Sequence, residues 1–138
     1  VSEIRPFLPP ETSPQLPLTR LRKEKHGRFH TTDPKTGKIS FGWENDSGHF
    51  RFEQNGLEID NYDLDTYTMR PGDPLSAKAR CERRMSLKRG DWDIHVAAVS
   101  EMTADAAHFH LVDRLVTREG DEVVFDKTWR NVIPRAHV

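Results

Sequence analysis

The stretch 73–134 constrains the fold most, because apolar and polar residues alternate along nearly all of it. Alternation with a period of two is typical of strands that turn one face to a core and the other to water. Short breaks containing glycine or small polar residues divide the stretch into four predicted strands, at 75–87, 92–102, 106–117 and 121–133. The pattern therefore predicts an antiparallel meander of four long strands.

One set of residues on each strand is expected to face inward and to supply most of the core. Its members are Leu75, Ala77, Ala79, Cys81, Met85 and Leu87, then Trp92, Ile94, Val96, Ala98 and Met102, then Ala107, Phe109, Leu111 and Leu115, and finally Val123, Phe125, Trp129 and Ile133. Cys81 is the single cysteine, so no internal disulfide or cysteine-rich zinc site is possible within this sequence. Its inward position favours a small buried apolar residue over a nucleophile.

The first turn gives a register that can be checked on both faces. A two-residue loop at 89–90 pairs Met85 with Ile94. On the opposite face the same loop places Lys78 opposite Glu101, a favourable cross-strand charge pair. A slip of one residue would turn a whole apolar set outward, so agreement between the faces supports the pairing.

The next two turns extend the register. A two-residue loop at 103–104 pairs Ala98 with Phe109. The last hairpin needs an odd loop, because both apolar sets are odd-numbered. A three-residue loop ending in Gly120 meets this need, with Gly120 left-handed and a β-bulge beside it. Phe109 is then expected to pair with Trp129 as a core residue.

The remaining sequence divides the chain in two. Residues 1–38 hold six of the nine prolines and are predicted to be an arm or linker, with the basic stretch 18–26 as one edge strand or coil. Residues 39–138 are predicted to be the β domain. Shorter strands are expected at 39–44, 49–53, 57–60 and 63–69, with turns at 45–48 and at Asn55-Gly56. The all-β domain is expected to be an antiparallel meander of long strands in a curved sheet, a sandwich or a partly closed barrel.

Composition limits the partners and the location. The formal net charge of −1 gives no electrostatic case for nucleic acid or for an anionic membrane. No apolar run approaches the roughly 18 residues of a spanning helix and no signal peptide is visible, so we predict a cytoplasmic protein. The first residue is Val1, which indicates processing or a piece of something longer.

Motifs for catalysis and cofactors are missing from the sequence. It contains no nucleophile elbow, no Walker loop and no dinucleotide fingerprint. Ser47 lies beside one glycine in a predicted turn and is not expected to be a nucleophile. We therefore predict no catalytic residue and no cofactor in this chain.

Three histidines form the most metal-like pattern. His108 and His110 are two residues apart on a predicted strand, so they share a face. The register places His95 on the same face of the neighbouring strand. Three histidines suit zinc or iron, but no carboxylate of that face clearly completes the shell, so a solvated or interface surface is favoured and no metal is predicted.

Two further features concern the inward face. Arg83, Asp113 and Lys127 are polar, and a buried charge must be paired, so contact between some of them is expected. Residues at the rim of the sheet or a paired structural ion cluster are favoured over a ligand site. The large aromatic residues of the strands either form the core or line a ligand pocket inside a barrel. They are Trp43, Trp92, Phe109, Phe125 and Trp129.

Several stretches resemble the C-terminal β-rich region of the X-prolyl dipeptidyl-peptidase and cocaine-esterase superfamily of hydrolases. They are YTMRPGDPLSA at 67–77, RGDW at 89–92, MTADAAHF at 102–109, EGD at 119–121 and WRNVIPRAHV at 129–138. In that family an α/β-hydrolase domain carries a Ser-Asp-His triad and a β-rich region packs against it. None of the triad positions falls in this chain.

The resemblance implies a non-catalytic C-terminal β domain of a serine hydrolase, with the catalytic domain of the same polypeptide as its partner. A homo-oligomer is possible, and neither nucleic acid nor a membrane is expected as a partner. Two alternatives stay open. One is a free-standing barrel or sandwich that binds a small apolar ligand, and the other is a histidine-ligated metal protein.

Overall fold

The structure is a computed structural model that describes residues 7–136. All regular secondary structure in that range is β-strand, which confirms the all-β fold class. The eight strands are β1 (Leu18–Arg22), β2 (Lys25–Thr32), β3 (Ile39–Phe52), β4 (Glu58–Arg70), β5 (Asp73–Arg89), β6 (Trp92–Ala104), β7 (His108–Glu119) and β8 (Glu122–Pro134). Residues 7–136 accordingly include no helix with the length and apolarity that crossing a bilayer requires.

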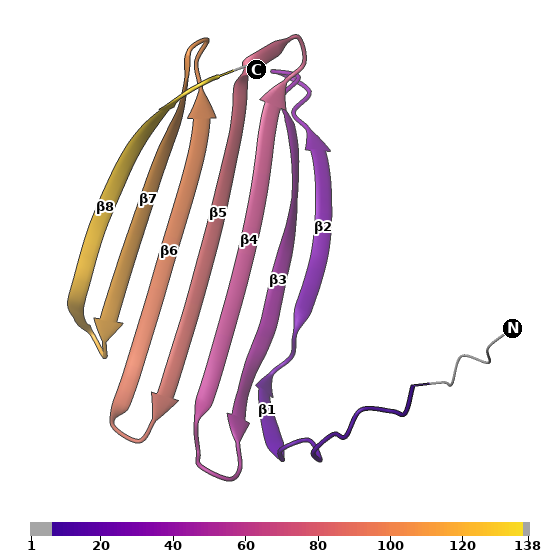
Figure 1. Ribbon diagram of the computed structural model, residues 1–138, viewed down its shortest axis with the longest axis vertical. Coiled ribbons are helices and arrows are strands. Elements are labelled where there is room, and N and C mark those ends of the chain that lie inside the picture. Colours follow the sequence, from indigo (N-terminus) through magenta and orange to yellow (C-terminus); the bar gives the residue numbers. More distant parts are fainter. Residues whose placement is uncertain (1–6, 137–138) are drawn as a thin grey trace, which may run out of the picture.

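The strands form one open, curved antiparallel sheet, as the predicted meander requires (Figure 1). β3 to β8 follow in chain order across the sheet, and each is hydrogen-bonded to the next. β1 and β2 share the outer side of β3, β1 at its C-terminal end and β2 along the rest. Residues 18–32 therefore belong to the sheet, whereas 7–17 precede it without regular structure. Of the shapes left open by the sequence, the described residues adopt the single curved layer.

β3 is one strand, although the sequence predicted two strands and a turn at 45–48. A β-bulge between Asp46 and Gly48 takes the place of that turn. The Asp46 carboxylate accepts the Gly48 N–H at 2.8 Å, and Gly48 has a φ of +78°. Asx and glycine residues favour bulges as well as turns, so the same local chemistry here bends a strand without reversing it.

The turn at Asn55-Gly56 is confirmed. Gly56 has a φ of +69°, and its N–H donates to the Phe52 carbonyl at 2.8 Å. The hairpin leads into β4, which is continuous where the sequence predicted two short strands.

The β5–β6 hairpin turns one residue later than predicted, at 90–91. Gly90 takes the first turn position with a φ of +58°, the left-handed conformation that a tight two-residue hairpin favours there. Met85 consequently lies opposite Val96 rather than Ile94. The pairing moves by two residues, so every side chain keeps its predicted face.

The β6–β7 hairpin turns three residues later than predicted. Asp105 closes it, because its carboxylate Oδ1 accepts the backbone N–H groups two and three residues further on, both at 2.7 Å. Ala98 therefore pairs with Leu115, and the predicted pairing with Phe109 is wrong. A residue that accepts from the backbone in this way builds an Asx turn.

The β7–β8 hairpin has the predicted left-handed Gly120, with a φ of +54°, and a bulge beside it in β8. Its loop has two residues rather than three. Phe109 pairs with Ile133, and Trp129 pairs with Asp113, so the predicted pairing of Phe109 with Trp129 is wrong. From Phe125 onward the shift is an even number of residues, and those side chains keep their predicted faces. Val123 does not, because the bulge places it opposite Arg118 on the other face, so its predicted inward position is wrong.

Residues paired across neighbouring strands share a face, and the register divides the sheet into an apolar face and a charged face. The apolar face carries Ile39, Phe41 and Trp43 of β3, Ile59 and Tyr67 of β4, Ala79, Cys81, Met85 and Leu87 of β5, Ile94, Val96, Ala98 and Met102 of β6, Phe109, Leu111 and Leu115 of β7, and Phe125, Trp129 and Ile133 of β8.

The apolar face is not a core within this chain, and that part of the prediction is wrong. None of the hydrophobic side chains among residues 7–136 is buried, and Phe41 and Met102 are 40% and 43% exposed. Trp129 is only half-buried. A sheet needs a second layer to bury one face, and the described residues supply only one layer.

Candidate interaction surface

The apolar face is large enough to be an interface. The sheet is seven strands wide along its main path, and β4 and β6 have 13 residues each. With strands about 4.8 Å apart and about 3.3 Å per residue, such a face covers roughly 1,200 Å². One side of a standard protein–protein interface buries about 800 Å². The face therefore has room for a stable contact with another folded unit.

Two polar rows cross the middle of the apolar face, with apolar bands on either side of them. The first row contains Trp43, Asp65, Cys81, Ser100, Asp113 and Trp129. The second row contains Asn45, Asp63, Arg83, Ala98, Leu115 and Lys127. A face that only packs against another layer does not need charged side chains at its centre, so these rows are candidates for specific recognition.

Asp63, Asp65 and Arg83 form an ionic cluster within these rows, which we call the Arg83 cluster. Arg83 Nη2 donates to Asp65 Oδ2 at 2.9 Å, and Nη1 lies 2.8 Å from Oδ1 while donating to the Glu82 carbonyl. Arg83 Nε lies 3.4 Å from Asp63 Oδ1. Asn45 Nδ2 donates to Asp63 Oδ2 at 3.2 Å. The Asp65 side chain is only 6% exposed, whereas that of Arg83 is 46% exposed.

Electrostatics fix the protonation of the groups around the cluster. The hydrogen bond from Arg83 lowers the pKa of Asp65, although burial opposes this. Burial raises the pKa of the Cys81 thiol, and the neighbouring Asp65 carboxylate raises it further. At neutral pH Asp65 is therefore ionised and Cys81 is a thiol. A protonated thiol is a poor nucleophile, so this arrangement suits recognition rather than covalent catalysis.

The sequence predicted contact among Arg83, Asp113 and Lys127, and the structure pairs them differently. Arg83 binds the two aspartates of β4. Lys127 Nζ lies 5.0 Å from the centroid of the Trp129 ring, a cation–π contact. Asp113 lies in the row next to that of Arg83, opposite Ser100. The expected contact among the three is therefore wrong. Arg83 is ion-paired, but its side chain is 46% exposed, and the buried charge of the pair is Asp65.

An apolar hollow of about 500 Å³ lies on the same face near the start of β5. Ala77 and Ala79 leave space there between the larger side chains of neighbouring strands. The hollow is also lined by Ile39, Phe41, Tyr67, Met69, Met102, Phe109 and Arg135. The Arg135 guanidinium lies 5.2 Å from the centroid of the Phe109 ring and donates to the Asp105 carbonyl at 3.0 Å. Arg135 and Lys78 are the charged residues among those that line this hollow.

The charged face, on the other side of the sheet, carries many ion pairs between neighbouring strands. Glu101 lies opposite Arg80, and its carboxylate lies 2.7 Å from both Arg80 Nη1 and Lys78 Nζ. The predicted attraction between Lys78 and Glu101 thus forms although the register differs. Further pairs are Lys25–Glu44, Arg22–Asp60, Arg51–Glu58, Lys88–Asp93 and Arg114–Asp126. Such solvated pairs add little stability each but keep this face in water.

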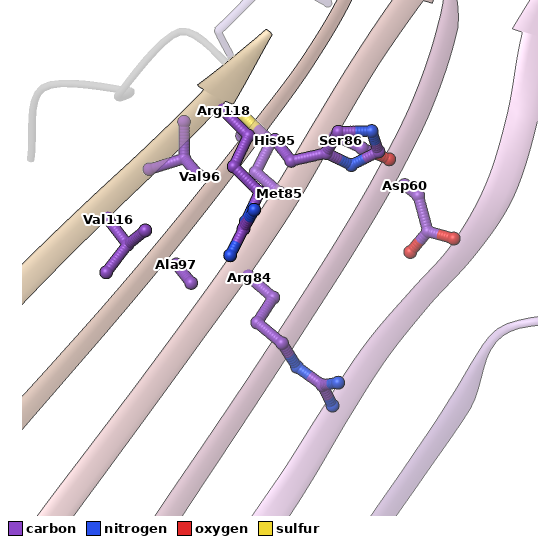
Figure 2. Close-up of a pocket in the computed structure, with 9 residues that line it drawn as sticks. All are labelled: Asp60, Arg84, Met85, Ser86, His95, Val96, Ala97, Val116 and Arg118. Atoms are coloured by element: carbon purple, nitrogen blue, oxygen red, sulfur yellow. The ribbon is translucent and has the colours of Figure 1, made fainter. Parts of the chain in front are cut away.

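A hollow of about 230 Å³ interrupts the charged face over β5 and β6 (Figure 2). It forms over Ala97, which lies between Arg84 and Val116 in the register. His95 of β6 and Arg118 of β7 also line it. Figure 2 shows these side chains coming from neighbouring strands, without one point on which they converge.

The basic groups around this hollow already have contacts. Arg84 lies over the Tyr62 ring, with the guanidinium carbon 4.1 Å from the centroid. Arg118 donates to a turn carbonyl at 3.3 Å, and His95 Nε2 lies 3.0 Å from a carboxylate oxygen of Asp93. The hollow therefore carries no set of groups aimed at one ligand.

The structure separates the three histidines of the predicted metal pattern. His95 lies opposite Arg118, eight residues further along β7 than His110, a distance of roughly 26 Å along the strand. His110 Nε2 lies 2.7 Å from Asp105 Oδ2, and His108 Nδ1 lies 3.7 Å from Asp105 Oδ1. The expected neighbourhood of His95 and His110 is therefore wrong. Within residues 7–136 no three metal-ligating side chains gather at one point.

Ser47 and the aromatic residues complete the predicted features. Ser47 lies in the bulge of β3 and not on a strand-to-helix turn. The open sheet encloses no barrel interior, so Trp43, Trp92, Phe125 and Trp129 line no common pocket. Trp43 packs with its neighbours on the apolar face, 5.6 Å from the Tyr67 ring by centroid distance. Phe109 alone of the five named aromatics lines the apolar hollow.

Sequence reasoning missed Asp63 and Asp65. Their signal was available in β4, where Asp63, Asp65 and Tyr67 alternate and so share a face. The prediction misses them because it gives faces only to the four long strands, and Asp63 and Asp65 lie on a shorter one.

Comparison with known proteins adds no relative: no protein-family model, no curated protein and no solved structure matches the chain. The resemblance to the peptidase and esterase superfamily therefore stays a prediction.

Proposed function

We propose that this chain is a non-catalytic β domain that packs through its apolar face against a catalytic domain of α/β-hydrolase type in the same polypeptide. The observation that carries the proposal is the uncovered apolar face, on which no hydrophobic side chain of residues 7–136 is buried. Exposed apolar bands on both sides of two polar rows, on a face of this width, mark an interaction surface. The hydrolase type of the partner rests on the resemblance of 67–77 and 102–109.

The contacts of the histidines support a non-catalytic role. Serine acyl transfer needs a nucleophile within hydrogen-bond reach of a histidine base. His49, His95, His108 and His110 contact carboxylates instead. The Cys81 thiol lies beside Asp65, which keeps it protonated. The proposal includes a cytoplasmic location, with which a free thiol is compatible.

The Arg83 cluster gives the partner a specific chemistry. Two carboxylates and one guanidinium carry a formal charge of −1 in the middle of the apolar face. A wholly apolar partner would bury this unbalanced charge, which is costly. The matching surface is therefore apolar, with a lysine, an arginine or backbone N–H groups opposite Asp63, whose side chain is still 24% exposed.

The test is association in trans. The 138-residue chain and the remainder of its natural reading frame are expressed separately and mixed, and binding is followed by calorimetry. Tyr67→Glu on the apolar face should abolish binding. Its matched control, Thr66→Glu on the charged face of the same strand, should not. A reading frame without a hydrolase domain, or equal effects of the two variants, would overturn the proposal.

Activity provides a second test. The chain alone should hydrolyse neither p-nitrophenyl esters nor X-Pro-p-nitroanilides, and a fluorophosphonate probe should leave it unlabelled. Turnover above buffer that one Ser→Ala change abolishes would refute the non-catalytic role.

The apolar hollow favours a second candidate function, binding of a small apolar ligand. Its volume suits a short acyl chain, and Arg135 at its wall suits a carboxylate head. Titration with decanoate separates the candidates. Micromolar binding that Ala79→Trp abolishes and Thr66→Trp preserves would favour ligand binding over domain packing.

A further inference from the structure

β8 leaves one backbone edge of the sheet open. It is the last strand of the sheet, and within residues 7–136 no strand lies on its outer side (Figure 1). The Arg135 N–H donates to the Ala107 carbonyl of the β7 side, so odd-numbered backbone groups of β8 face β7. The even-numbered groups from Asp126 to Val132 consequently face outward and are free to bond another strand.

The sequence of this edge is complementary to itself. We propose that two copies of the chain pair β8 against β8, antiparallel, about a two-fold axis through Thr128. Asp126 then lies opposite Arg130 of the partner subunit, and symmetry repeats the pair. Lys127 lies opposite Trp129 of the partner subunit on the other face. This inference does not depend on the proposed function.

The side chains of β8 are suited to this pairing. Arg130 is exposed and has no ion-pair partner among the described residues. Asp126 receives Arg114 Nε and Nη2 at 3.0 and 2.7 Å, but a carboxylate accepts about four hydrogen bonds, so it has capacity for a second guanidinium. Lys127 already lies over one Trp129 ring, and the pairing brings it beside a second.

Only this register combines the two ion pairs with outward-facing backbone groups. An axis through Asp126 or Arg130 would place that charged residue against its own copy. An axis through Lys127 would do the same, and an axis through Trp129 would set Asp126 opposite Val132. Around Thr128 the outward groups form about six backbone hydrogen bonds.

The dimer would extend both faces of the sheet. Paired residues share a face, so the two apolar faces lie on the same side of one continuous sheet. Backbone pairing at an open edge is a common means of strand addition. The apolar face of each copy stays available to its other partner.

Cross-linking tests the axis directly. In a Cys81→Ser background, Thr128→Cys should oxidise to a disulfide-linked dimer, because a residue on the axis faces its own copy about 5.5 Å away between Cα atoms. Arg130→Cys, opposite Asp126 of the partner subunit, should cross-link at least about tenfold more slowly. Equal rates, or no cross-linking of either variant, would overturn the proposal.

Charge reversal tests the ion pairs. The chain should sediment as a dimer at concentrations on the order of 100 µM, and Arg130→Glu or Asp126→Lys alone should weaken dimerisation roughly 10- to 100-fold. Mixing the two variants should restore a heterodimer. Arg28→Glu at the opposite edge is the matched control and should leave the dimer intact. A monomeric chain with a folded far-ultraviolet spectrum, or a dimer that only Arg28→Glu weakens, would show the inference wrong.

Discussion

The ion pair between Asp65 and Arg83 should be the most costly polar contact to remove from the apolar face. Asp65→Ala deletes both contacts to the Arg83 guanidinium, at 2.8 and 2.9 Å. A hydrogen bond to a charged group is worth about 1.5–3 kcal/mol, and truncating one partner of a fully buried pair costs about 3–5 kcal/mol. Because Arg83 is 46% exposed and keeps Asp63, we expect a loss of about 1.5–3 kcal/mol.

The assay is urea unfolding of the chain, followed by tryptophan fluorescence. A double-mutant cycle of Asp65→Ala and Arg83→Ala should give a coupling energy of about 1–2 kcal/mol. Asp63→Ala is the control, since its contact to Arg83 Nε is longer at 3.4 Å and its loss should cost under about 1 kcal/mol. A loss of stability below about 0.5 kcal/mol for Asp65→Ala, with no coupling to Arg83→Ala, would refute the claim that this ion pair stabilises the fold.

The same pair sets a pH dependence. Arg83 lowers the pKa of Asp65 in the folded state, so ionised Asp65 stabilises the fold above the pKa of an unfolded aspartate, about 3.9. That stabilisation is lost as the pH falls through the lower folded value. The stability difference between the natural chain and Asp65→Asn should thus be constant at pH 6–8 and shrink below about pH 4. A difference that grows on acidification would contradict the assigned cause.

Three further predictions concern the edge strand, the bulge in β3 and the β6–β7 turn. Trp129→Ala should cost about 1–2 kcal/mol in urea melts, below the 3–5 kcal/mol usual for a core tryptophan, because Trp129 is half-buried. Gly48→Ala should cost about 1–3 kcal/mol, since Gly48 has a φ of +78° and an added Cβ would lie 2.5 Å from a backbone oxygen of β1, whereas Gly56→Ala meets open space and should cost less. The backbone N–H groups of Ala107 and His108 donate to the Asp105 carboxylate, so Asp105→Ala should speed their hydrogen exchange. Asp121→Ala, in another turn, should leave these two N–H groups protected.

The faces of β5 to β8 could be predicted from the sequence, but their register could not. Alternation predicts which face each side chain occupies, and a register shift of two, four or six residues leaves that face unchanged. The position of each turn then decides the register. The sequence predicts Gly90 as the second residue of its loop, whereas it is the first. The carboxylate of Asp105 places the next turn three residues later than predicted. Single turns with two plausible positions are not resolved by local propensity alone.

The core could not be predicted for a different reason. Alternation shows that one face avoids water, but not what covers it. For Phe41 and Met102 nothing within residues 7–136 does, and both remain about two-fifths exposed. The bulge at Gly48 shows the same limit on a small scale, because Asx and glycine chemistry fixes a local bend but not whether the chain turns back. In both cases local sequence gives the chemistry of a residue but not the contacts that residues distant in the sequence make with it.

The polar rows would make this apolar face bind a partner in one orientation, in addition to providing apolar contact. Apolar area alone tolerates many orientations of a partner, because hydrophobic contact is non-directional. The Arg83 cluster has two carboxylates and one guanidinium, so one negative charge is not neutralised. An orientation of the partner that buries this carboxylate without a cation opposite it is unfavourable, because burying an unpaired carboxylate costs more than the surrounding apolar contact gains. Asp63 is the group with unfilled capacity, as Asn45 and Arg83 reach it only at 3.2 and 3.4 Å. A partner that places a cation opposite Asp63 would therefore be held in one position against the sheet, whose hydrophobic side chains are not buried within residues 7–136.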